Sequence, residues 1–96
     1  MNRLVSSGVL GPGQAEYFDI VLRGGITYSI YVDPDEIGVD FDLYVYDENG
    51  NLITQDTTTN SDALCFITPR WTGPFRMVVK SERGVSNYHI RVEERI

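Results

Sequence analysis

The sequence predicts an all-β protein, a jelly-roll-like antiparallel β-sandwich of seven to eight short strands. The first observation is a strict alternation of apolar with polar or aromatic side chains over residues 39–46, the period-two pattern of a half-buried strand. The second is that similar short runs recur between turns rich in Gly, Pro, Asn and Asp. The third is that no segment of useful length repeats apolar residues at the i, i+3, i+4 spacing of an amphipathic helix.

The expected strands follow one another at short intervals, with residues 1–13 as a linker or a short first strand. They span residues 16–22, 26–32, 40–46, 52–55, 63–68, 75–80 and 88–92. Gly24-Gly25 separates the first two, which we expect to pack as neighbours across this short turn. Asn49-Gly50 favours a tight hairpin after the third. In each strand one parity is apolar, as at Phe41 and Val45, and that parity is expected to form the core.

Length and charge restrict the possible functions. The 96 residues are expected to form one domain, residues 1–96, and 42% apolar with 23% charged content is typical of a globular protein. A formal net charge of −6 argues against nucleic-acid binding and against docking on an anionic membrane, and it suits cations or basic partners. No stretch has the length of a membrane span, and residues 1–10 lack the apolar core of a secretory signal.

Four short motifs occur in an order that is typical of one family. They are Tyr28-Ser29-Ile30, Asp40-x-Asp42-Leu43-Tyr44, Gly73-Pro74-Phe75 and Asn87-Tyr88-His89-Ile90. Through them the chain resembles the bacterial pre-peptidase C-terminal domain family, relatives of the collagen-binding domains of clostridial collagenases. The resemblance implies a jelly-roll-like sandwich and a non-catalytic accessory domain of secreted peptidases. It also implies calcium binding in some members, and collagen gripped by surface tyrosines in the collagenase relatives. We expect two departures from this pattern: no peptidase precedes the domain in the 96 residues, and residues 1–13 have no clear counterpart of the acidic linker that supplies calcium ligands in the collagenase relatives.

Acidic residues around the third strand are candidate calcium ligands. Asp40 and Asp42 project from one face with their Cα atoms about 7 Å apart, as strand geometry dictates. Asp33, Asp35 and Glu36 lie in the preceding loop and are weaker candidates, because calcium takes six to eight oxygen ligands. The alternative is that Asp40 and Asp42 anchor the backbone of a loop through Asx-type hydrogen bonds.

Tyrosines on the same strand face are candidate ligand-binding residues. Tyr44 and Tyr46 share the face of Asp42, and Tyr31 is expected on a neighbouring strand. Exposed tyrosines offer a large rigid contact area and a hydroxyl group for recognition. The alternative is that these rings are ordinary packing. Trp71, in a loop flanked by Pro and Gly, is either an exposed anchor or a plug of the core, and we favour the plug.

The sequence offers little for catalysis. Cys65, the single cysteine, lies in an apolar run and is expected to be buried, while His89, the single histidine, falls on an outer face. No Gly-x-Ser-x-Gly elbow is present. We therefore predict a binding module for a protein or polymer ligand. The alternative is a purely structural or self-associating domain, a monomer or weak homo-oligomer, and a hydrolase is the least favoured reading.

Overall fold

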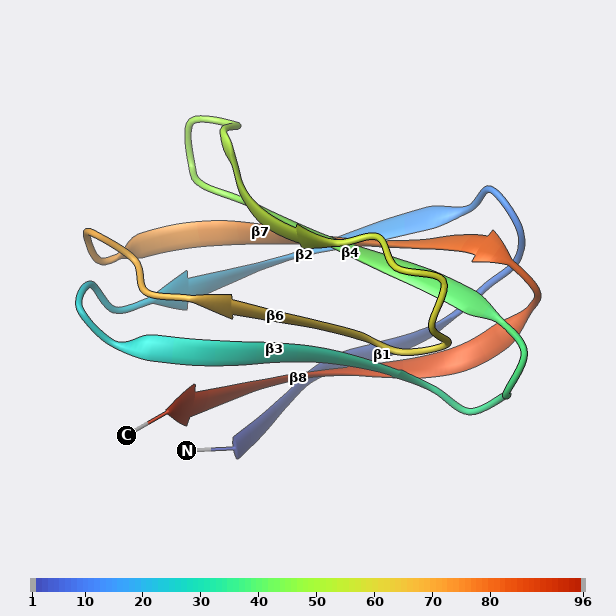
Figure 1. The fold of residues 1–96 in the computed structure, drawn as a ribbon. Helices are drawn as coiled ribbons and strands as arrows, with labels where there is room; N and C mark the ends of the chain where they lie inside the picture. Colours follow the sequence, from blue (N-terminus) through green and yellow to red (C-terminus); the bar gives the residue numbers. More distant parts are fainter. Residues whose placement is uncertain (1, 96) are drawn as a thin grey trace.

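Eight β-strands form two four-stranded antiparallel sheets that pack face to face (Figure 1). The computed structural model describes the backbone of residues 2–95 and the side chains of residues 6–95. The strands are β1 (Asn2–Leu10), β2 (Ala15–Leu22), β3 (Thr27–Pro34), β4 (Asp40–Tyr46), β5 (Leu52–Asp56), β6 (Ala63–Ile67), β7 (Gly73–Arg83) and β8 (Ser86–Arg95). The predicted all-β sandwich is confirmed. No helix in the described residues is long and apolar enough to cross a membrane.

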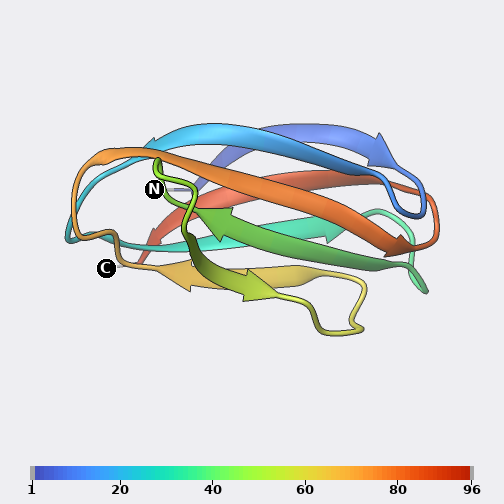
Figure 2. The ribbon, with the colours of Figure 1, turned by 90° about the horizontal axis from the view of Figure 1, so that it is seen from above.

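The strand order is β1-β8-β3-β6 in the first sheet and β2-β7-β4-β5 in the second. Figure 2 shows the two layers from above. Among the described strands, β4 and β5 are the one pair that is consecutive in the chain and also hydrogen-bonded. Their hairpin contains Asn49-Gly50 as expected, and Gly50 has a φ of 82°, which a residue with a side chain rarely adopts. All other pairings join strands that are distant in the sequence.

The expectation that β2 and β3 pack as neighbours is wrong, because they lie in different sheets. Both strands have apolar side chains at every second residue. The connection between them crosses from one sheet to the other, so that these apolar side chains of both strands face the same core. The β6–β7 connection also crosses between the sheets. The two connections are in contact, because Gly25 N donates a hydrogen bond to Pro69 O over 2.8 Å. A Cβ at Gly24 would come within 2.9 Å of the Trp71 backbone, so this close approach requires glycine.

Strand β1 is longer than the sequence indicated. Residues 8–10, which lie in the segment expected to be a linker or a short first strand, continue the strand and pair with Tyr88, Asn87 and Ser86 of β8. The backbone at Gly8 lies close to two side chains, because a Cβ would lie 2.5 Å from Glu16 Oε1 and 3.3 Å from the Tyr88 ring. Glycine therefore marks a tight contact in a strand at this position, and the chain turns at residues 11–14 instead.

The core lies between the sheets and consists of the predicted apolar parities. Phe41, Leu43 and Val45 of β4 are completely buried, as are Ile30 of β3 and Met77 of β7. Each such side chain contributes about 1.5–3 kcal/mol relative to exposure, by its apolar area. The predicted burial of Cys65 is also confirmed. The opposite parity of each sheet is consequently available to solvent or a ligand, and on the second sheet it includes the outward residues of β4.

Candidate ligand-binding face

The outward parities of β2, β7 and β4 combine into one surface on the second sheet. Tyr17 pairs with Val78, which pairs with Tyr44, and one step along the strands Asp19 pairs with Arg76, which pairs with Tyr46. We call this surface the tyrosine face. It comprises Tyr17, Asp19, Asp42, Tyr44, Tyr46, Arg76, Val78 and Lys80. The predicted Tyr44 and Tyr46 thus lie together on it, half-buried.

Tyr17 and Arg76 were not singled out from the sequence, yet they give the tyrosine face its most defined geometry. Tyr17 is 56% exposed, and the Arg76 guanidinium carbon lies 4.0 Å from the centroid of its ring. Arg76 also grips Asp19 with two parallel hydrogen bonds, Nε to Oδ1 at 2.8 Å and Nη2 to Oδ2 at 3.0 Å. This pairing lowers the pKa of Asp19 and raises the pKa of Arg76. The two hydrogen bonds to Asp19 and the contact with the Tyr17 ring together fix the Arg76 side chain in place.

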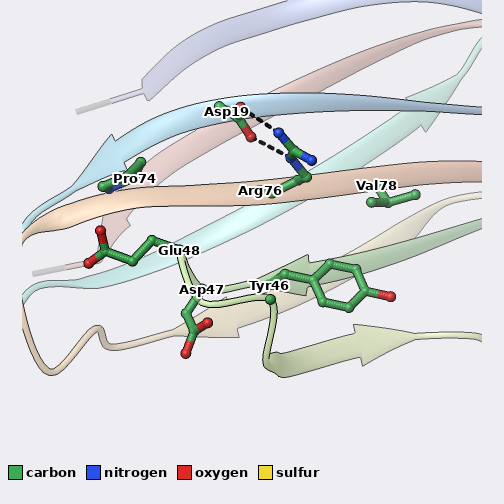
Figure 3. A pocket seen from close by; sticks show the side chains of 8 residues that line it. Asp19, Tyr46, Asp47, Glu48, Pro74, Arg76 and Val78 are labelled. Atoms are coloured by element: carbon green, nitrogen blue, oxygen red, sulfur yellow. Dashed lines mark hydrogen bonds and ion pairs between the residues drawn. The ribbon is translucent and has the colours of Figure 1, made fainter.

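Two hollows flank the ridge that Arg76 and Val78 form on β7. The larger, about 580 Å³, lies between β7 and the β4–β5 hairpin (Figure 3). Its lining comprises Asp19, Tyr46, Asp47, Glu48, Gly50, Pro74, Arg76 and Val78. The smaller, about 410 Å³, lies toward β2 and is lined in part by Tyr17 and Glu16. The tyrosine face therefore contains two shallow depressions of a size to receive side chains of a partner.

Asp40 and Asp42 come together at one end of the tyrosine face, as their spacing predicted. Asp42 is only 4% exposed, and burial, aided by the negative charges of Asp40 and Glu82, raises its pKa to about 6. The Oδ1 atoms of Asp40 and Asp42 are buried without a hydrogen-bond partner. The alternative role of anchoring a loop falls to Asp47, whose Oδ1 accepts from the amides of Asn49 and Asn51 at 2.8 and 2.9 Å.

The weaker candidate ligands do not join this pair. Asp33 lies on β3 beside His89, and Asp35 Oδ1 is 4.0 Å from His89 Nε2. The amide of Glu36 donates to Ser86 Oγ over 3.0 Å, which holds that loop against β8. In the described residues, no group of three or more His, Cys, Asp or Glu side chains is placed to hold a metal ion. The two carboxylates supply only part of the six to eight oxygen ligands that calcium takes, which argues against this ion.

Tyr31 and Trp71 occupy positions that differ from the expectation. Tyr31 lies on the outer face of the first sheet, because β3 and β4 belong to different sheets, and its hydroxyl donates to Asp62 Oδ2 over 2.7 Å. That hydrogen bond is the main cause that raises the pKa of Tyr31 to about 12. Trp71 is 39% exposed and is not a core plug. Its indole Nε1 donates to Glu48 Oε1 over 2.8 Å, a polar contact that a position in the core would forfeit.

Comparison with known proteins supports the fold. The structure is similar to the pre-peptidase C-terminal domain of a collagenase from Bacillus anthracis, with a TM-score of 0.77 and 14% identity over 97% of this chain and 90% of that one. It is also similar to a periplasmic inhibitor of g-type lysozyme from Aeromonas hydrophila, with a TM-score of 0.68 and 10% identity over 98% and 86%. No protein-family model and no curated protein matches the sequence. The resemblance found in the sequence motifs is thus confirmed for the fold.

Proposed function

We propose that this chain is a non-catalytic binding module that holds a protein or polymer ligand on the tyrosine face. The observation that carries the proposal is the row Tyr17–Val78–Tyr44, which presents two tyrosine rings on either side of a small apolar residue. Rigid aromatic rings in a partly apolar surface supply much of the binding energy at protein interfaces, because little side-chain entropy is lost. Arg76, already fixed by Asp19, adds a preorganised charged group.

The reactive side chains of the chain favour binding over catalysis. Cys65 is buried, and that burial raises the pKa of its thiol to about 11, which disfavours a nucleophilic thiolate. The similar structures are an accessory domain of a peptidase and a protein inhibitor of an enzyme. Both are consistent with a module that acts by contact.

The proposal is tested by replacing the rings and measuring retention on immobilised ligands. The probes are fibrillar collagen and a g-type lysozyme, chosen from the names of the two similar proteins. Tyr17→Ala with Tyr44→Ala is expected to weaken retention by about tenfold or more, as for central interface residues. Phe66→Ala is the matched control, since Phe66 is 55% exposed, close to the 56% of Tyr17, but lies on the first sheet. Equal retention of the double variant and the control would reject the tyrosine face.

A second candidate function, self-association, is favoured by the edge strand β6. Its sequence Ala63–Ile67 contains no charged residue and no proline, two of the usual protections of an edge, and a pairing strand would have to displace Asp56 Oδ2 from the Leu64 amide. Leu64 and Phe66 are 44% and 55% exposed there. A second copy pairing antiparallel with this strand would place Leu64 opposite Phe66. Sedimentation at about 1 mM protein tests this, and dimers that Phe66→Lys dissociates would support it, whereas a monomer at that concentration would exclude it.

A further inference from the structure

We infer that the larger hollow of the tyrosine face, between β7 and the β4–β5 hairpin, receives an arginine side chain of a partner polypeptide. The inference rests on the proposed binding function and names the chemistry of the partner. It follows from three properties of the hollow: an excess of negative charge, walls suited to a flat cation, and a carboxylate that is already held in place.

The charge of the hollow is unbalanced. Asp19, Asp47 and Glu48 contribute carboxylates, whereas Arg76 is the one cation among the lining residues. Figure 3 shows that Arg76 turns away from the hairpin toward Asp19, to which it is bonded. The charge of Arg76 is therefore balanced by Asp19 on β2, and the hairpin side of the hollow keeps an excess of negative charge. Electrostatic complementarity then favours a cationic group from a partner.

The charged residues around the hollow also leave an excess of negative charge. Lys80, the cation next along β7 on this face, lies 3.1 Å from Glu82 Oε1 and is neutralised by it. Asp40 and Asp42 lie at the far end of the same face, and among the described residues their buried Oδ1 atoms have no hydrogen-bond partner. A positively charged segment lying along β4 would thus meet carboxylates at both ends of the tyrosine face. This extended complementarity indicates a polypeptide with more than one basic residue.

The walls of the hollow suit a guanidinium group in particular. Tyr46, Pro74 and Val78 form its apolar part, against which the methylene groups of an arginine can pack. The protein already holds one guanidinium by this chemistry, because Arg76 stacks on Tyr17 and pairs with Asp19. Tyr46 and Glu48 place a ring and a carboxylate on the hairpin side of β7, and Figure 3 shows them pointing toward opposite ends of the hollow. A planar guanidinium can pair with a carboxylate through two parallel hydrogen bonds, which an ammonium group cannot, and this favours arginine over lysine at Glu48.

Glu48 is preorganised for this role. Its Oε1 accepts the Trp71 indole hydrogen over 2.8 Å, so the side chain is held at the rim of the hollow. The hairpin that carries it is fixed in turn by Asp47, which accepts hydrogen bonds from the Asn49 and Asn51 amides. Because these side chains are ordered before a partner arrives, binding loses less conformational entropy.

The test is a titration of the ¹⁵N-labelled chain with two hexapeptides, followed by NMR. One alternates glycine with arginine, and the other replaces arginine by citrulline, its uncharged isostere. The arginine peptide is expected to shift the amides of residues 46–50 and 75–78, and the citrulline peptide to bind at least about fivefold more weakly. Raising the salt concentration from about 0.02 M to about 0.3 M is expected to weaken the arginine peptide alone, since screening shortens the reach of charges.

Two variants locate the interaction. Glu48→Gln keeps an oxygen for the Trp71 hydrogen bond and removes the charge, and it is expected to weaken the arginine peptide by about fivefold. Glu36→Gln is the control, because it makes the same charge change on the β3–β4 loop, away from the hollow. Trp71 fluorescence provides a second readout, since its indole is bonded to Glu48.

The outcomes separate this inference from the proposed function. Equal binding of the two peptides at the hollow would overturn the arginine requirement while leaving the tyrosine face as a binding surface. Equal weakening in Glu48→Gln and Glu36→Gln would show general attraction to an acidic chain and would also overturn it, as would shifts confined to other faces or absent altogether. The retention assay with Tyr17 and Tyr44 replaced judges the proposed function independently of all these results.

Discussion

Tyr88 in β8 donates its phenol hydrogen to Glu16 in β2, with 2.6 Å between Oη and Oε1, so that one side-chain hydrogen bond joins the two sheets. The Tyr88 ring is completely buried and packs against Phe41 and Phe18, with centroids 5.7 and 6.4 Å away. Burial, followed by the hydrogen bond to Glu16, raises the pKa of Tyr88. Gly8 leaves room for this pair, because a Cβ there would displace the Glu16 carboxylate and press on the Tyr88 ring.

We predict that Tyr88→Phe lowers the free energy of unfolding by about 1 kcal/mol, the usual contribution of one hydrogen bond whose acceptor can still reach water. The ring packing is retained, so the loss reports the hydrogen bond. Urea denaturation measures it. Tyr31→Phe is the comparison, because it removes a similar bond to Asp62 at the surface of the first sheet. A Tyr88→Phe loss no larger than that of Tyr31→Phe would contradict a stabilising bridge between the sheets.

The buried carboxyl of Asp42 makes stability depend on pH. Its pKa is about 6 in the folded chain and about 4 in an unfolded chain, so the folded state binds its proton more tightly. Between these values the folded state holds more protons, and stability therefore falls as pH rises from about 4 to about 6. We predict that Asp42→Asn is more stable than the parent by about 2 kcal/mol at pH 7, and that this difference shrinks toward pH 4.

Denaturation of both proteins at several pH values checks this, and the quantity to follow is the difference between them, since other carboxyls titrate in both. Asp19→Asn is a suitable contrast, because the Arg76 pairing lowers the pKa of Asp19 and reverses the sign of its contribution. A parent that is more stable than Asp42→Asn at pH 7 would mean that the ionised Asp42 has a cationic partner after all.

Calcium is predicted to leave stability unchanged. Asp40 and Asp42 are the two carboxylates that meet, and Asp33, Asp35 and Glu36 are held near β8 instead. An ion bound only to the folded state raises the melting temperature by mass action. Thermal melts in excess chelator and in about 1 mM calcium are therefore expected to agree within about 1 °C. A rise in calcium that Asp42→Asn abolishes would refute this reading of the site.

The sequence predicted which residues face the core, since that depends on local alternation alone. Phe41, Leu43 and Val45 illustrate it, because every second residue of a strand points the same way whatever its partner. Strand partners were predictable only for β4 and β5, where Asn49-Gly50 specifies a hairpin. Elsewhere the chain crosses between the sheets, and no local signal distinguishes a crossing turn from a hairpin.

The candidate site was predictable to the same extent. The spacing of Tyr44 and Tyr46 placed them on one face, but the neighbours Tyr17 and Arg76 come from strands that the sequence did not pair with β4. Tyr31 was misplaced for the same reason. The Trp71 error has another cause: an indole N–H needs an acceptor, and Glu48 lies 23 residues away in a hairpin whose position depends on the whole fold.

The last prediction concerns the edge where β5 and β6 meet. Cys65 of β6 is 3% exposed, and burial raises its pKa to about 11, so we predict slow alkylation of the native chain at about pH 8. Labelling then requires local opening of this edge. Asp56 holds the edge closed, because its Oδ2 accepts the Leu64 amide hydrogen over 2.9 Å and its Oδ1 accepts from Thr58.

Asp56→Ala is therefore expected to accelerate the labelling of Cys65 by about tenfold or more, and by more than the change in global stability explains. Mass spectrometry of iodoacetamide-treated samples gives the rate, and urea denaturation gives the stability. Asp62→Ala is the matched control, since Asp62 lies at the other end of the β5–β6 connection and accepts a hydrogen bond from Tyr31 on the outer face. If the two variants label at one rate, Asp56 does not hold the edge closed, and the covering of Cys65 depends on its packing in the core instead.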